Sequence, residues 1–523
     1  MRLGCAWLVF LCLHLELELV QAARILGVFP FRHSSPFQIV RPVLRALVER
    51  GHNVTMISPE GIPEDIEGMR HIRVEKLNQR TRDLMHSDLL QGFLNNKWIE
   101  GLLASEMHYN MSEAILYDDG VQQMLRDRRE RFDMVMLEMS SIDALYGLGE
   151  FYNATLVGVS SLRLNWNIED LAGNPAPSIS EPISPLGYAM DTSFLSMIHN
   201  WIYINEEKML VHFLVRPPQL RLFKKFFGYS AETFRNLRGR FSLILSNSHF
   251  SLGRARANVP NIIEIGGVHL SEAPEPCDEK LQRFMDEAEH GVIYLSMGLE
   301  ILVRFLPQNM QQSLMQSFSR LKQRIVWKNE VSMSPNKTDK IYMMEKVPQR
   351  HVLAHPKVRL FITQGGMLSV MEAVYSGVPM LGLPLFFDHS SNINQVRQAG
   401  MAEILDTNNL NVDTLTSTIL ELLENPKYAQ KAKEMSESFR DRPMSPLETA
   451  VWWTEYALRH PNPTHIRLNS EDISLMRYYR LDSLLTYGLR FGLVIASIIF
   501  LSYMWFQNYR NNRRHIVINL PIK

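Results

Sequence analysis

The chain has few cysteines and no excess charge of either sign. Only 3 of its 523 residues are cysteine, and Cys5 and Cys12 lie in an apolar run at the N-terminus. If that run is removed, Cys277 remains alone and an intramolecular disulfide is excluded. The 55 basic residues balance the 55 acidic residues, so the charge does not indicate a nucleic acid or another polyanion as partner. A chain this long must be stabilised by its hydrophobic core instead.

The N-terminal run has the features of a secretory signal peptide. Arg2 precedes the apolar run 5–13, and Val20-Gln21-Ala22 offers small residues for cleavage after about Ala22. Because the run is too short to stay as a membrane anchor, we expect residues 1–22 to be removed. Four glycosylation sequons agree with a lumenal body: Asn53, Asn110, Asn153 and Asn336. Asn53 stands just before a predicted strand, and we expect it to be poorly accessible.

A longer apolar run lies near the C-terminus, at residues 484–506. As a helix it would span about 34 Å at 1.5 Å per residue, which is enough for a hydrocarbon core of about 30 Å. Arg490 interrupts the run and must extend toward the membrane interface. The basic tail 507–523, after a cleaved signal peptide, predicts a single-pass type I protein with a cytosolic tail. A buried soluble helix is the alternative. The endoplasmic reticulum membrane is the leading expectation for location, and the plasma membrane is the other one.

Between these two runs, strand and helix patterns alternate. Apolar runs at 24–29 and 54–58 enclose an amphipathic helix at 39–49, with a loop at 33–37. This order predicts a βαβ unit whose ligand-facing loop follows the first strand. Further apolar runs predict the remaining strands of an α/β fold: 133–137, 156–159, 243–247, 262–267, 292–296, 324–328, 358–363 and 380–387.

The stretch 361–400 carries the most specific pattern. Gln364-Gly365-Gly366 joins a predicted strand to a predicted helix at 367–375. Such a turn points free backbone N–H groups at an anion, and glycine allows a close approach. Ser369 and Glu372 lie one helical turn apart and can face one ligand. Glu372 suits ribose hydroxyls and Ser369 a phosphate oxygen, although many ordinary strand-to-helix turns have the same pattern.

The whole stretch resembles the donor-binding motif of the UDP-glycosyltransferases, the family that includes the membrane-bound UDP-glucuronosyltransferases. The family pattern runs Thr-His-Gly-Gly, Ser, Glu three residues later, Gly-Val-Pro, Gly-Leu-Pro, and then Asp-Gln and Asn. The matching residues are Thr363, Gly365, Gly366, Ser369, Glu372, Gly377-Val378-Pro379, Gly382-Leu383-Pro384, Asp388 and Asn392. Gln364 replaces the family His, and His389 replaces the family Gln. The resemblance extends from about Arg24 to the C-terminal tail.

The resemblance implies a GT-B type fold, in which two Rossmann-like domains face a cleft. The N-terminal domain, 23–270, would bind a small lipophilic acceptor, and the C-terminal domain, 283–460, would bind the UDP-sugar. A linker at 271–282 would join them, and a juxtamembrane segment at 461–483 would lead to the transmembrane helix. The implied reaction transfers a hexosyl group with inversion and needs no metal and no cofactor other than the UDP-sugar as co-substrate. The sequence leaves open whether the chain forms a homo-oligomer.

The acceptor side departs from the family pattern. The family places a general-base His in the first loop, and here that position is occupied by Pro36, which cannot accept a proton. His33 lies three residues earlier and is the candidate replacement. The family's acidic partner of the base corresponds to Glu138. Glu138 is either a catalytic residue beside His33 or a solvated carboxylate at a strand end.

The donor side departs as well. Lys346 stands where the family has a Trp that stacks on the uracil, while Pro348 and Gln349 are kept. Leu299 replaces a family Ser near the diphosphate. The donor-binding candidates are therefore Gln349, Gln364, Gly365, Gly366, Ser369, Glu372, Asp388, His389 and Asn392. Two hypotheses follow: a membrane-bound UDP-glycosyltransferase with an atypical site, and a non-catalytic member of the fold that acts as a binding or interaction protein in the secretory membrane.

Overall fold

The computed structural model describes residues 22–31, 35–59, 66–77, 97–161, 164–174, 194–253, 258–298, 308–329, 339–385, 388–468 and 481–518. The signal segment, His33, Leu299 and Asn336 lie outside these ranges. The chain divides into two compact units. One holds nearly all described residues up to Arg467, and the other holds the C-terminal helix.

Seven parallel strands form the N-terminal sheet, in the order β3-β2-β1-β4-β5-β6-β7. Their bounds are β1 Arg24–Val28, β2 Asn53–Pro59, β3 Arg70–Val74, β4 Met134–Glu138, β5 Thr155–Ser160, β6 Phe241–Ser246 and β7 Ile262–Glu264. The strand order reverses between β1 and β4, whose residues Val28 and Leu137 are paired. In an open α/β sheet a ligand crevice lies beyond the carboxyl ends of such a pair.

Helices cover both faces of this sheet, because successive strand residues point to opposite sides. Leu26 packs in one core cluster with residues of α10 (Arg216–Phe227) and α11 (Ala231–Arg238). Ile25 packs in another with residues of α2 (Ser35–Glu49) and α19 (Pro446–Arg459). The other N-terminal helices are α5 Lys97–Leu116, α6 Asp119–Arg126, η1 Asp143–Tyr146, α7 Gly147–Tyr152, α8 Trp166–Ala172, α9 Phe194–Leu210, η2 Val211–Val215 and η3 Val268–Leu270.

The predicted loop at 33–37 is shorter than expected. Helix α2 begins at Ser35, four residues before the predicted start, and Pro36 lies in its first turn. Proline is accepted there because the first N–H groups of a helix have no partner within the helix. Pro36 is also buried. The position of the family base is therefore part of a helix and not of a loop.

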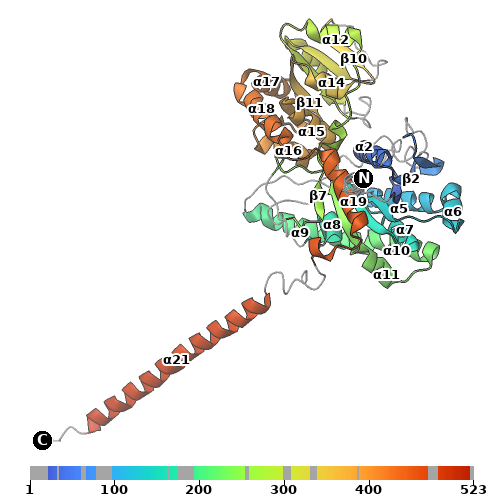
Figure 1. The fold of residues 1–523 in the computed structure, drawn as a ribbon. Helices are drawn as coiled ribbons and strands as arrows, with labels where there is room; N and C mark the ends of the chain where they lie inside the picture. The colour runs from blue at the N-terminus through green and yellow to red at the C-terminus, as the bar shows by residue number, and fades with distance from the viewer. Residues whose placement is uncertain are drawn as a thin grey trace, which may run out of the picture. The chain divides into compact units, whose positions relative to one another are not determined.

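Six parallel strands form the C-terminal sheet, in the order β10-β9-β8-β11-β12-β13. Figure 1 labels β10 and β11 of this sheet, together with several helices that pack on it. Their bounds are β8 Val292–Ser296, β9 Arg324–Lys328, β10 Ile341–Met344, β11 Val358–Thr363, β12 Met380–Gly382 and β13 Ala402–Ile404. The predicted strand 380–387 ends early, at Gly382. Pro384 follows, and a proline cannot donate to the strand ladder.

Helices also cover both faces of the C-terminal sheet. Their bounds are α12 Glu279–Asp286, α13 Gln308–Arg320, α14 Gln349–Ala354, α15 Met367–Ser376, α16 His389–Gln398, η6 Thr407–Asn409, α17 Val412–Glu424 and α18 Pro426–Arg440. Helix α12 begins inside the segment expected to be the linker. Helix α19 follows this sheet in sequence but packs on the N-terminal one, where the carboxylate of Glu455 lies 2.9 Å from Arg50. The expected domain boundaries stay a proposal.

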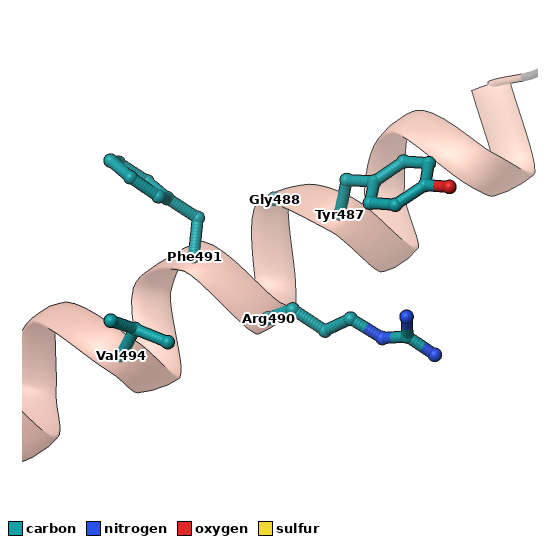
Figure 2. A pocket seen from close by; sticks show the side chains of 5 residues that line it. All are labelled: Tyr487, Gly488, Arg490, Phe491 and Val494. Atoms are coloured by element: carbon teal, nitrogen blue, oxygen red, sulfur yellow. The ribbon is translucent and has the colours of Figure 1, made fainter.

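The C-terminal helix α21 spans Leu481–Ile518, longer than the predicted 484–506. Its segment Leu485–Arg510 is long and apolar enough to cross a membrane. Figure 2 shows the side chains around a shallow depression on this helix. Arg490 extends toward the N-terminal end of the helix, away from Phe491. Helical side chains lean in that direction, which is the geometry an arginine needs to bring its charge to an interface.

Candidate functional site

The turn between β11 and α15 is held in a shape that only glycine adopts without strain. Gly365 has a φ of 99°, and a Cβ atom on it would lie 2.8 Å from the carbonyl oxygen of His389. Asn392 Nδ2 donates to the Gly365 carbonyl at 3.0 Å, and the Gly365 N–H donates to Thr363 Oγ1 at 3.2 Å. Gly366 caps the N-terminus of α15. This end of α15 therefore offers backbone N–H groups and a positive dipole.

Three predicted donor-site residues meet in one hydrogen-bonded cluster. Gln349 Nε2 donates to Ser369 Oγ at 2.9 Å and to Glu372 Oε2 at 2.6 Å. Gln349 Oε1 accepts from the hydroxyl of Tyr294 at 3.0 Å. Gln349 opens α14, while Ser369 and Glu372 lie on α15. The fold thus joins residues that are 20 and more positions apart in sequence, as the motif resemblance implies.

Glu372 is buried, and no cation among the described residues is in direct contact with it. Burial raises the pKa of Glu372 to about 7, against smaller lowering effects of the Gln349 amide and of the charges on Arg350 and Lys328. His269, in η3, places Nε2 3.7 Å from Glu372 Oε1. Burial lowers the pKa of His269 to about 3, so its imidazole is neutral. The site residue predicted for ribose therefore faces a neutral histidine on the segment that follows β7.

The replacement of the family His by Gln364 leaves a buried polar group next to the glycine turn. Gln364 Oε1 is buried and has no hydrogen-bond partner within the described part of the chain. Gly298, after β8, has a φ of 89°, and any side chain on it would collide with the Gln364 amide. Lys328 Nζ donates to the Gly298 carbonyl at 2.8 Å. A cation thus lies at the end of β9, although burial lowers the pKa of Lys328.

The remaining donor-site candidates are placed differently. Asp388 and His389 are buried at the start of α16, and burial lowers the pKa of His389 to about 4, so it is neutral. Lys346 extends into solvent with 85% of its side chain exposed, 3.3 Å from Glu275. Its stem cannot replace an aromatic ring as a stacking surface for a base.

On the acceptor side, Glu138 ends β4 and is 2% exposed. Its Oε1 accepts from the backbone N–H of Ser161 at 3.2 Å and from its hydroxyl at 2.5 Å. Its Oε2 is buried and has no hydrogen-bond partner among the described residues. Burial raises the pKa of Glu138 to about 7, against the smaller effect of Ser161. Glu138 is therefore a buried carboxyl and not the solvated strand-end carboxylate of the alternative interpretation.

Sequence reasoning did not find Ser161, Tyr294, His269 and Lys328. Ser161 and Lys328 had an available signal, because each stands at or just after the carboxyl end of a strand. Tyr294 lies inside a strand and His269 in a short turn, where no pattern singles them out. No group of three or more His, Cys, Asp or Glu side chains suited to a metal ion occurs in the described ranges.

Comparison with solved structures identifies the class of fold. A glycosyltransferase of kitacinnamycin has a TM-score of 0.56, with 15% identity, over 83% of this chain and 99% of its own. The calicheamicin glycosyltransferase CalG4 has a TM-score of 0.55, with 16% identity, over 85% of this chain and 100% of its own. The two parallel, Rossmann-like sheets are those of a GT-B glycosyltransferase fold, which confirms the predicted fold class.

Sequence comparison then gives the family. Residues 24–516 match the family of UDP-glucoronosyl and UDP-glucosyl transferases, and the chain belongs to that family. It is 29% identical to UDP-glycosyltransferase UGT5 of Dactylopius coccus, over 94% of this chain and 92% of the relative. It is 28% identical to 2-hydroxyacylsphingosine 1-beta-galactosyltransferase of Rattus norvegicus, over 90% of this chain and 87% of the relative. It is 31% identical to UDP-glucuronosyltransferase 2C1 of Oryctolagus cuniculus, over 63% of this chain and 64% of the relative. The predicted family is confirmed, and the chain is a UDP-glycosyltransferase.

Proposed function

We propose that the chain transfers a hexosyl group from a UDP-sugar to a small lipophilic acceptor, with inversion, while anchored in a membrane by α21. The observation that carries this proposal is the hydrogen-bonded cluster of Gln349, Ser369 and Glu372. It presents a carboxylate and an amide for the ribose of the nucleotide, beside the N-terminus of α15 for its phosphates.

In this proposal each donor-site candidate has a defined role. Gln349 and Glu372 bind the ribose hydroxyls, and Ser369 with the backbone of Gly365 and Gly366 binds the diphosphate. Asp388 and His389, at the start of α16, contact the sugar. Asn392 holds the glycine turn through the Gly365 carbonyl, and the Gln364 amide replaces the family imidazole beside the diphosphate.

The transfer step needs a base for the acceptor proton. The acceptor oxygen attacks the anomeric carbon as the bond to the diphosphate oxygen breaks, and the proton passes from the acceptor to the base. The buried Glu138 carboxylate supports His33 in that role, since a negative charge beside an imidazole favours its protonated form. The electron pair of the broken bond goes to the diphosphate, which the α15 dipole stabilises.

A lipophilic acceptor is supported by the surface of the N-terminal domain. Helix α9 exposes Leu195, Trp201 and Met209 by 77, 56 and 55%. Exposed apolar side chains gathered on one helix mark a surface that contacts apolar partners. A relative that is 28% identical is named for galactosyl transfer to 2-hydroxyacylsphingosine, which is a lipid.

The alternative is a non-catalytic UDP-glycosyltransferase fold that binds a partner in the secretory membrane. Pro36 is buried within α2 at the position of the family base, and Lys346 faces solvent at the position of the uracil stack. Both observations favour weak binding and slow chemistry. For either function we place the body in the lumen of the endoplasmic reticulum.

One experiment separates the two functions. The full chain in detergent is titrated with UDP by calorimetry, and UDP release is then measured with a panel of UDP-sugars and a phenolic acceptor. We expect binding that Gln349→Ala weakens, because Glu372 loses its donor, whereas the exposed Gln430→Ala changes nothing. UDP binding without release supports the non-catalytic function. Absence of UDP binding contradicts the proposed donor site.

A further inference from the structure

His269 occupies an unusual place beside the donor cluster. It is 6% exposed and sits in η3, directly after the N-terminal sheet, whereas Glu372 belongs to α15 of the C-terminal sheet. Both ring nitrogens of His269 are buried and lack a partner within normal hydrogen-bond geometry among the described residues, although a hydrogen-bonding contact with the backbone of Leu368 acts to raise the pKa of the ring. A buried polar group without a partner is costly, so its position needs an explanation.

The segment that carries His269 is fixed to the donor site by Arg350. Its guanidinium donates to the carbonyl oxygens of His269, Leu270 and Glu272, at 3.3, 2.9 and 2.6 Å. Arg350 follows Gln349 directly in α14. Arg350 therefore binds the η3 segment, while its neighbour Gln349 binds the Glu372 carboxyl.

The same segment is also tied to the acceptor side. Glu272 accepts from Arg45 at 2.7 Å and is paired with Arg41, and both arginines lie on α2. Helix α2 begins with the turn that contains Pro36. Polar contacts thus run from α2 through Glu272 to Arg350, which follows Gln349 of the ribose-binding cluster in the chain.

We propose that His269 is a positioning residue of the nucleotide-sugar site. Its neutral Nε2–H donates to Glu372 Oε1 when that carboxyl is ionised, and holds the carboxylate toward the ribose hydroxyls. This inference rests on the proposed donor function of Glu372. The present separation of 3.7 Å exceeds a hydrogen bond by less than an ångström, so a small shift of α15 against η3 closes it.

The charges around Glu372 leave this role to a neutral donor. Lys328 on β9 and Arg350 on α14 act on the carboxyl only through space. Tyr294 on β8 is un-ionised, because burial raises its pKa well above the ordinary range. Gln349 already donates to the other carboxylate oxygen, Oε2. The remaining oxygen, Oε1, faces His269 Nε2 at 3.7 Å.

The test measures the affinity of the full chain for UDP-glucose between pH 6 and 8, where the diphosphate diester keeps its charge. Affinity should rise with pH as Glu372 ionises. His269→Leu should lower the affinity at neutral pH by roughly tenfold and move the midpoint of the profile to higher pH. His269→Gln keeps an N–H donor and should restore both. Each profile is repeated in a Glu138→Gln background, because Glu138 titrates in the same range.

A purely structural role gives a different result. In that case His269→Leu and His269→Gln weaken binding equally and leave the midpoint where it is, and the proposal is wrong. His249→Leu is the matched control, because His249 is also a buried histidine of lowered pKa but stacks on Phe439. It should leave the midpoint unchanged.

A second measurement does not depend on nucleotide binding. A double-mutant cycle between His269→Leu and Glu372→Gln is followed by thermal unfolding of the full chain. Coupling is expected at pH 8, where Glu372 is ionised, and should vanish at pH 5. Absence of coupling at pH 8 overturns the pairing. If the wild-type chain fails to bind UDP-glucose while the coupling is present, the proposed function fails and the His269–Glu372 contact stands.

Discussion

At the scale of single residues, the two buried carboxyls control how the chain responds to pH. Glu138 ends β4 and Glu372 lies on α15, yet burial raises both pKa values from 4.5 to about 7. Neither is neutralised by a cation in contact among the described residues. Perturbed carboxyls in such positions are typical of functional sites, where folding stability is given up for chemistry.

We expect Glu138→Gln to stabilise the protein at pH 8. A carboxyl whose pKa is raised on folding binds its proton more tightly in the folded state, so stability falls as pH rises from about 4.5 through 7. The wild-type chain should therefore lose a few kcal/mol relative to the variant across this range, and the two should unfold at similar temperatures near pH 5. Thermal unfolding at several pH values is the measurement, with the exposed Glu424→Gln as control. An unchanged difference between variant and wild type across this range would contradict the burial argument.

If His33 does not act as the base, we expect Pro36→His to raise turnover. A positioned general base contributes about 10²–10⁴-fold, and proline supplies none. Wild-type turnover should favour phenols, whose pKa near 10 makes proton loss easier, over aliphatic alcohols. UDP release with a matched phenol and alcohol measures both effects.

His33→Ala shows whether another base has replaced the missing one. If His33 acts as the base, this variant abolishes the wild-type activity and Glu138→Ala depresses it. If neither residue affects rapid transfer to aliphatic alcohols, the assignment of this region to the acceptor site is wrong.

At the scale of elements, the short helix α14 matters more than its length suggests. It is six residues long, and its first two residues contact both the donor cluster and the segment after β7. The two sheets are formed by different parts of the chain. Helix α14 links them through the contacts of Arg350 with backbone carbonyls after β7. Helix α19 links them through buried apolar residues.

We expect Arg350→Met to destabilise the protein by roughly 1–3 kcal/mol, since three carbonyl groups lose their donor. UDP affinity should fall as well, because η3 and His269 are then free to move away from Glu372. Chemical unfolding and calorimetry measure the two effects. Arg320→Met is the control, since Arg320 forms only an exposed pair with Asp413 at 2.7 Å, and such pairs contribute at most about 1 kcal/mol. Equal effects of the two substitutions would contradict a special role for Arg350.

At the scale of the whole molecule, the described part of the chain combines a two-sheet body with one helix apolar enough to cross a membrane. The described sequons lie on the body. Asn153 is exposed at the end of α7, and Asn53, expected to be poorly accessible, is exposed at the first residue of β2. Asn110 lies within α5, and its access depends on the packing of that helix.

We expect glycans on the body of the membrane-inserted protein. Endoglycosidase should increase its gel mobility, and Asn153→Gln should remove one step of the shift, because an exposed residue at a helix end is open to modification. The tail from residue 507 should be digested by protease added outside sealed vesicles. A protein without any glycan shift whose C-terminal tag is protected would have the opposite topology.

The sequence by itself determined the class of fold and the family, and it predicted the members of the proposed donor cluster. Glycine turns, strand runs and the order of the motif are local features, and parallel strands bring their carboxyl ends to one edge whatever the details. That is why Gln349, Ser369 and Glu372 could be predicted as one group.

Only the tertiary structure decided the surroundings of these residues. Burial around Glu138 and Glu372, the start of α2 at Ser35, and the contact of His269 with Glu372 depend on how distant segments pack. No local pattern encodes the dielectric environment of a carboxyl, because that environment is set by side chains from other elements. The candidate donor residues can therefore be recognised from the motif, whereas the protonation state of Glu372 and its contact with His269 depend on the fold.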